Sequence, residues 1–172
     1  MRRTAVYKHP LFLEHYTGRG HLESAGRLEA LYRELEDDGL AAHLLFPSFS
    51  PANHDSILLN HSREHLQTVA ATAHRLASML DADTRTSAAS FEAALYAVGA
   101  VIDGIKRLDR AEIDNGFCLV RPPGHHAERE TPMGFCLFGN VAIGAKRALD
   151  HHGLLRVAIV DFDVHHGNGT QD

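Results

Sequence analysis

A continuous apolar run, followed at once by metal-binding residue types, is the feature of this chain that most restricts its fold. Val157 to Val160 are consecutive apolar side chains, and most of them are β-branched. A run of this kind is typical of a strand buried on both faces of a parallel sheet. Asp161, Asp163 and His165 follow at intervals of two, so in an extended backbone their side chains point the same way. The run predicts an α/β protein with a divalent-metal site at the carboxyl end of one strand.

Composition places the chain among ordinary globular proteins. It has 172 residues, of which 44% are hydrophobic and 23% charged, enough for one domain or part of one. The net charge is -5 and no Lys or Arg run occurs, so we expect neither a nucleic-acid partner nor a membrane partner. No apolar run reaches membrane-spanning length and the N-terminus lacks a signal-peptide pattern, so a cytoplasmic location is expected.

Cys118 and Cys136 lie in apolar runs and are expected to be buried, reduced thiols. The oligomeric state stays open, a homo-oligomer included.

Strands and helices are expected to alternate along most of the chain. The predicted strands are Thr4 to Tyr7, His43 to Phe49, Gly116 to Val120, and Val157 to Asp161. The predicted helices contain Leu28 to Leu35, a stripe from Leu66 to Leu80 capped by Ser62, Phe91 to Arg107, and Asn140 to Asp150. The segment LDADTRTSAAS between them has the composition of a loop. This order indicates a mainly parallel sheet, in which ligands bind beyond the carboxyl ends of the strands.

A second polar motif, RPPGHHAE, occupies residues 121–128. Its prolines and glycine favour a rigid, irregular backbone that can hold the adjacent imidazoles of His125 and His126 together. Such a pair suits proton transfer if its neighbours set the two protonation states differently. Asp161 and Asn168 are the expected neighbours, one charged and one neutral. The alternative is a surface histidine pair in a proline-rich turn, which is less favoured because the metal-type motif follows the next strand.

The metal-type motif and the segment between the two motifs each have a simpler interpretation. Asp163 and His165 supply two of the three protein ligands that a catalytic zinc site needs. Alternatively, they are an aspartate capping a helix and a histidine in a glycine turn, an interpretation that the length of the string DFDVHHGNG disfavours. The segment MGFCLFGN, residues 133–140, is best explained as core, although Gly134 permits a ligand to approach the backbone.

Three strings, RPPGHHAE, MGFCLFGNVAIGA and VDFDVHHGNGTQD, together resemble the zinc-dependent histone deacetylase superfamily, near its class II and acetylpolyamine amidohydrolase branch. The segments HPLFLEHYTGRGH and LLNHSREH are also similar, so the resemblance covers nearly the whole chain. It implies the arginase-deacetylase fold, a central parallel sheet flanked by helices, with residues 1–172 as the N-terminal part of a single deacetylase domain. Members of the superfamily hydrolyse acetylated amines, such as acetyl-lysine in proteins or acetylpolyamines.

The resemblance also assigns expected roles to individual residues. Asp163 and His165 match two zinc ligands, and His125 and His126 match the catalytic pair, with His126 as the general base. Asp161 then supports His125, and Asn168 supports His126. With the backbone carbonyls of Asp163 and His165, Asp161 also matches a structural potassium site. The remaining matches are Gly134 and Phe135 in the wall of the acyl tunnel, and Asp83, which falls where some relatives hold the substrate backbone.

The chain departs from the superfamily pattern in two respects. His21-Leu22-Glu23-Ser24-Ala25 stands where HPE followed by a proline is usual, so a differently shaped entrance is expected. The third zinc ligand, an aspartate, and the tyrosine that stabilises the transition state belong to later parts of the pattern. We therefore expect the 172 residues alone to be a very poor catalyst. The alternatives are a non-catalytic relative that binds an acylated ligand or partner, and a binuclear manganese hydrolase, which should carry more carboxylates.

Overall fold

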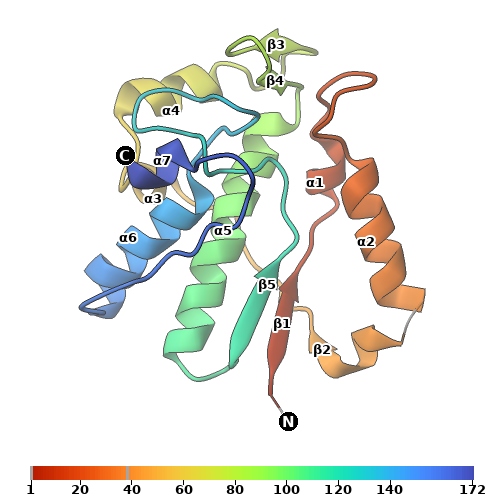
Figure 1. The fold of residues 1–172 in the computed structure, drawn as a ribbon, viewed down its shortest axis with the longest axis vertical. Coiled ribbons are helices and arrows are strands. Elements are labelled where there is room, and N and C mark those ends of the chain that lie inside the picture. Colours follow the sequence, from red (N-terminus) through yellow and green to blue (C-terminus); the bar gives the residue numbers. More distant parts are fainter. Residues whose placement is uncertain (1, 38) are drawn as a thin grey trace.

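The protein is built around a short parallel sheet. A computed structural model describes residues 2–37 and 39–172. Strands β1 (Thr4–Tyr7), β2 (Leu44–Leu45) and β5 (Asn115–Cys118) form the sheet in the order β2-β1-β5, and both pairings are parallel. β1 lies in the centre between β2 and β5 (Figure 1). Its residues Ala5, Val6 and Tyr7 are almost completely buried. The carboxyl ends of β1 and β5 point towards the loops that carry the polar motifs (Figure 1).

The sheet is flanked by helices. The long helix α5 (Ser90–Asp109) packs against the sheet and against α6 (Asn140–His152), and Ala100 of α5 shares a core cluster with Ala5 and Tyr7. The remaining helices are short, apart from α2, and are α1 (Leu11–Glu14), α2 (Gly26–Asp37), the 3-10 helix η1 (Leu40–His43), α3 (His54–Ile57), α4 (Arg63–Ala70) and α7 (Asn168–Gln171). None of the helices in the described part of the chain combines the length and the apolar character needed to cross a bilayer.

Several predicted elements occur with nearly the expected bounds. β1, α5 and α6 match their predicted ranges within a few residues, and β5 covers the first part of its predicted strand. The predicted cap is also confirmed, because the Ser62 side chain accepts a hydrogen bond from the backbone N–H of His65 at 3.1 Å. The strand expected between His43 and Phe49 is only the two-residue strand β2.

The predicted helical stripe from Leu66 to Leu80 is wrong beyond its first two turns. α4 ends at Ala70, and Leu76 is 91% exposed. His74 has a φ of +65°, which an α-helix cannot contain. A hairpin of β3 (Ser78–Met79) and β4 (Arg85–Thr86) then replaces the predicted helix end and part of the predicted loop. An apolar spacing that fits a helix does not by itself extend the helix through a turn.

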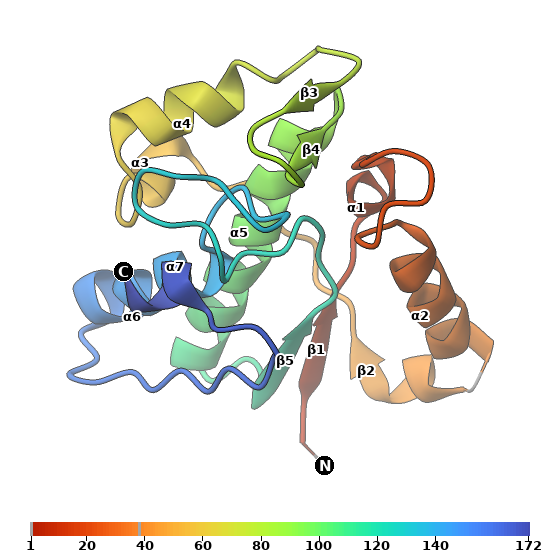
Figure 2. The same cartoon turned by 45° about the horizontal axis from the view of Figure 1, so that its top comes forward.

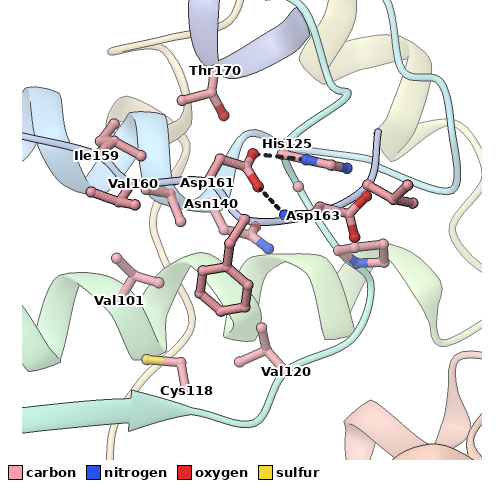
Figure 3. A pocket seen from close by; sticks show the side chains of 15 residues that line it. Val101, Cys118, Val120, His125, Asn140, Ile159, Val160, Asp161, Asp163 and Thr170 are labelled. Atoms are coloured by element: carbon pink, nitrogen blue, oxygen red, sulfur yellow. Dashed lines mark hydrogen bonds and ion pairs between the residues drawn. The ribbon is translucent and has the colours of Figure 1, made fainter. Parts of the chain in front are cut away.

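The strand predicted at residues 157–161 does not form in this structure. The segment is irregular, and Val160 and Phe162 are 84% and 95% exposed. A parallel strand takes its hydrogen bonds from neighbouring strands, and no strand in the described residues lies beside this segment. It faces a cavity of about 680 Å³ whose other walls include Val101 of α5 and Cys118 of β5 (Figure 3). The apolar side chains therefore line an open groove rather than a closed core.

Candidate functional site

The two adjacent histidines lie in the loop that follows β5. Their ring centroids are 4.0 Å apart and the ring planes are inclined by 49°. The first turn of α7 fixes this loop, because the N–H groups of Gly169 and Thr170 donate to the carbonyl of His125 at 2.9 and 3.2 Å. The structure thus holds side by side the two imidazoles that the sequence motif contains, and attaches them to the segment that follows Asp161.

Each imidazole makes a different hydrogen bond through its Nδ1 atom. His125 Nδ1 lies 2.9 Å from Asp161 Oδ2, and His126 Nδ1 lies 2.6 Å from Asn168 Oδ1 (Figure 3 shows the His125 contact). Both oxygens accept hydrogen bonds, so each Nδ1 carries a proton. The hydrogen bond from His125 holds the pKa of the Asp161 carboxyl below its usual range. One imidazole therefore has an anionic partner and the other has a neutral partner.

Glu128 is a member of this network that the sequence analysis did not single out. Its Oε1 accepts a hydrogen bond from Asn168 Nδ2 at 2.8 Å. This bond orients the amide of Asn168 so that its oxygen points to His126. The signal was available in the sequence, since Glu128 closes the RPPGHHAE string, but nothing local indicated that its partner lies 40 residues away.

Asp163 and His165 lie next to one another beyond the histidine pair. Asp163 Oδ2 accepts from the backbone N–H of His165 at 2.8 Å and lies 3.1 Å from His165 Nδ1. The hydrogen bond from this N–H lowers the pKa of the Asp163 carboxyl. The ring of His165 is 5.9 Å from that of His126. Within the described residues, no group of three or more His, Cys, Asp or Glu side chains is arranged to hold a metal ion.

Gly134 lies against His126, and Phe135 follows it in the same wall. A Cβ atom on Gly134 would lie 2.5 Å from Cδ2 of His126, so only glycine allows this approach. Phe135 has a φ of +68°, which is uncommon for a residue with a side chain, and its N–H donates to Thr84 Oγ1 at 3.0 Å. Because Thr84 belongs to the segment between β3 and β4, this bond connects the wall to the hairpin.

Asp83 lies between two cavities at the edge of the site. A cavity of about 370 Å³ is bounded by Asp83, His126, Gly134 and Asn168, among others. A second cavity of about 340 Å³ is bounded by Asp83, Phe135 and residues 19–22. His21 connects the two rim loops, since its Nε2 donates to the carbonyl of Asp83 at 3.0 Å and its ring meets that of Phe135 edge-on.

A buried ion pair between Arg121 and Glu23 anchors the start of the loop that carries the two histidines. Arg121, at the start of the RPPGHHAE segment, is 0% exposed and donates to both carboxylate oxygens of Glu23 at 2.6 and 2.7 Å. It also donates to the backbone carbonyls of Phe12 and His15. From the sequence, Glu23 is only part of a divergent loop, and no partner is evident for Arg121. A contact across 98 residues leaves no local pattern that could have indicated it.

Comparisons with known proteins identify the family and the fold. The histone deacetylase domain family matches residues 21–172. An uncharacterized protein of Synechocystis is 46% identical, over 93% of this chain and 53% of that protein. The histone deacetylase-like amidohydrolase of Pseudomonas aeruginosa is 35% identical, over 99% of this chain and 49% of that protein. The crystal structure of the HDA15 HD domain superposes with a TM-score of 0.94 at 36% identity, over 99% of this chain and 49% of that chain. The expected fold is thereby confirmed, and the chain spans about half the length of these relatives.

Proposed function

The chain belongs to the histone deacetylase family, and from that premise we propose that it carries the proton-transfer residues and two metal ligands of an enzyme that hydrolyses acylated amines. The observation that supports this proposal most directly is the pair of Nδ1 contacts, His125 to Asp161 and His126 to Asn168. Two adjacent imidazoles with differently charged partners can take different parts in one proton-transfer reaction.

In this proposal His126 is the general base. Its Nδ1 proton is donated to Asn168, so its Nε2 lone pair can take a proton from an attacking water. Asn168 is neutral, and its amide is held in place by Glu128. His125 donates its Nδ1 proton to the carboxylate of Asp161, a charged partner that His126 lacks. His125 therefore balances charge or delivers a proton to the departing amine.

The proposed metal is zinc, with Asp163 and His165 as two of its ligands. One carboxylate oxygen and one imidazole nitrogen already converge within 3.1 Å, and this combination of donors suits zinc. When bound, the ion supplies Lewis acidity for the acyl carbonyl and for water. Asp161 is also the proposed contributor to a structural potassium site, together with the backbone carbonyls of Asp163 and His165.

The same proposal gives the wall and rim residues a role in binding. Gly134 borders the cavity beside His126 and Phe135 borders the neighbouring cavity, so they would contact the acylated side chain along its path. Asp83 lies at the rim, where its carboxylate could accept hydrogen bonds from a substrate backbone. An acetylated amine, in acetyl-lysine or a polyamine, remains the proposed substrate class. A cytoplasmic location stays a prediction.

Zinc binding by the 172-residue chain tests the metal part of this proposal separately from catalysis. We expect one zinc ion per chain in competition with a chromophoric chelator, and at least about tenfold weaker binding for Asp163→Asn and for His165→Gln. His152→Gln is the matched control. The His152 side chain, at the end of α6, also lies 2.8 Å from a carboxylate, that of Asp109, but outside the proposed site. Equal zinc affinity in all variants would contradict the assignment, and two manganese ions per chain would favour a binuclear hydrolase.

Acetate release from an acetyl-lysine peptide tests the catalytic part. We expect slow release that needs zinc and that falls further in His126→Gln. The chain alone is expected to be about 100-fold to 1,000-fold slower than relatives of twice its length, the usual effect of losing one oxyanion donor. Release at the rate of those relatives would contradict the expectation of an incomplete site. If the chain binds zinc but releases no measurable acetate, with or without His126→Gln, a non-catalytic binding protein is favoured.

A further inference from the structure

Three cavities follow one another outward from His126, and each neighbouring pair shares a lining residue. The cavity beside His126 shares Asp83 with the cavity at residues 19–22, and that cavity shares Arg85 with a third cavity of about 530 Å³. The third cavity lies between the loop after α1 and the β3–β4 hairpin, which stand at the same end of the molecule (Figures 1 and 2). We call the second and third cavities together the rim groove. The rim groove therefore lies on the outer side of the cavity beside His126.

Positive charge is concentrated in the rim groove. Arg19 and Arg85 both line it, and neither makes an ion pair with any residue in the described ranges 2–37 and 39–172. The guanidinium of Arg85 lies against the backbone of Gly18, where an added Cβ would be 3.0 Å from Nη1. The nearest carboxylate along the groove is Asp83, at its inner end. One oxygen of the Asp81 carboxylate, Oδ1, accepts hydrogen bonds from the backbone N–H groups of Asp83 and Thr84.

Large apolar side chains surround these two arginines. Tyr16, Leu22, Leu76 and Met79 are 62%, 91%, 91% and 60% exposed, and each borders the rim groove. Exposed apolar side chains gathered on one surface, with charge beside them, commonly mark a contact site for another molecule. A compact polyamine has neither the apolar side chains nor the negative charge that this surface would complement.

We propose that the rim groove binds the polypeptide that flanks an acylated lysine and prefers flanks with acidic and apolar side chains. The inference rests on the proposed function, because it takes the acylated side chain to enter beside His126. The rim groove adjoins that cavity at Asp83, so a peptide whose acylated side chain enters beside His126 would lay its flanking residues against Arg19 and Arg85. The hydrogen bond from His21 to the Asp83 carbonyl holds the two sides of the groove together before any ligand binds.

Fluorescence anisotropy of labelled peptides on the 172-residue chain tests this proposal. The peptides share one acetyl-lysine and one leucine and differ only in two flanking positions, which are both Glu, both Ser or both Lys. The Glu peptide is expected to bind about tenfold more tightly than the Lys peptide, with the difference shrinking as salt rises from about 0.05 to about 0.5 M. An unlabelled acetyl-lysine peptide is expected to displace the labelled Glu peptide. An acetylated polyamine at the same concentration is expected not to displace it.

Variants identify the groups responsible. Arg19→Gln with Arg85→Gln should abolish the preference for Glu, whereas Arg33→Gln, an exposed arginine on α2, should leave it intact. Leu76→Ser should weaken all three peptides by a similar factor. Equal affinity for the Glu and Lys peptides, no binding of any peptide up to about 1 mM, or a preference that survives the double substitution would each overturn the proposal.

Unacetylated versions of the same peptides separate this proposal from the proposed function. If the Glu preference persists but acetylation makes no difference, the rim groove is supported and the acyl site is not. If acetylation strengthens binding but the flanking charge has no effect, the acyl site is supported and the rim groove is overturned.

Discussion

Substitution of Glu23 by glutamine should destabilise the protein more than any comparable change at an exposed carboxylate. The Arg121 side chain is 0% exposed and that of Glu23 is 6% exposed. Two hydrogen bonds of 2.6 and 2.7 Å join the guanidinium to the carboxylate, an arrangement in which each donor meets one oxygen. Glutamine offers a single acceptor oxygen and turns its NH₂ group towards a second donor. The positive charge of Arg121 then stays buried without a counter-charge.

The expected magnitude follows from this geometry. Removing one partner of a buried ion pair lowers the free energy of unfolding by about 3 to 5 kcal/mol. The carbonyls of Phe12 and His15 still accept from Arg121, so the lower end, about 3 kcal/mol, is expected. With a denaturant slope of about 2 kcal/mol per molar, the urea midpoint of Glu23→Gln should fall by roughly 1.5 M. Equilibrium unfolding at pH 7, followed by far-UV circular dichroism, measures this shift.

A surface pair provides the matched control. Glu112 accepts from Arg107 at 3.1 Å, but its side chain is 43% exposed, so Glu112→Gln should change the free energy of unfolding by less than about 1 kcal/mol. A shift for Glu23→Gln no larger than that of Glu112→Gln would refute the reasoning. Glu23→Leu combined with Arg121→Met should recover part of the loss, because no uncompensated charge then remains.

Three further predictions concern other parts of the chain. Burial lowers the pKa of His61 to about 4, so below pH 6.5 the folded state binds fewer protons than the unfolded state. The free energy of unfolding should therefore fall by roughly 3 kcal/mol as the pH drops from above 6.5 to about 4. Urea midpoints measured across this range should depend less on pH in His61→Gln. Gly134→Ala should displace the neighbouring imidazole and lower the urea midpoint more than Gly20→Ala, since both positions have positive φ but only Gly134 lacks room for a Cβ; an equal effect of both would contradict this. The double substitution Val160→Ser with Phe162→Ser removes two exposed apolar side chains, so it should reduce light scattering from aggregates and the binding of a hydrophobic dye, with little change in the urea midpoint. A large loss of stability would show that these side chains are buried in solution.

Local patterns predicted the elements whose stabilising contacts lie within a few residues. The bounds of α5 and α6 followed from spacing and composition, and the Ser62 cap followed from a serine that precedes a helical pattern. The end of α4 could not be predicted in this way. The apolar positions up to Leu80 keep a helical spacing, but the chain turns at His74 and pairs β3 with β4. Strand pairing competed with helix extension, and the spacing alone does not show which one is more stable.

The sequence by itself determined the chemistry of this protein: two imidazoles in a rigid loop, two carboxylates and a histidine after an apolar run, and a family resemblance strong enough to predict the fold. Only the tertiary structure decided which groups meet, as in the contact of Glu23 with Arg121 and in the link from His126 through Asn168 to Glu128. It also decided that residues 157–161 are not a strand, although their composition is that of one. The physical reason is common to these cases: a helix satisfies its backbone within one turn, whereas strands, buried charges and hydrogen-bond networks depend on partners that are distant in sequence.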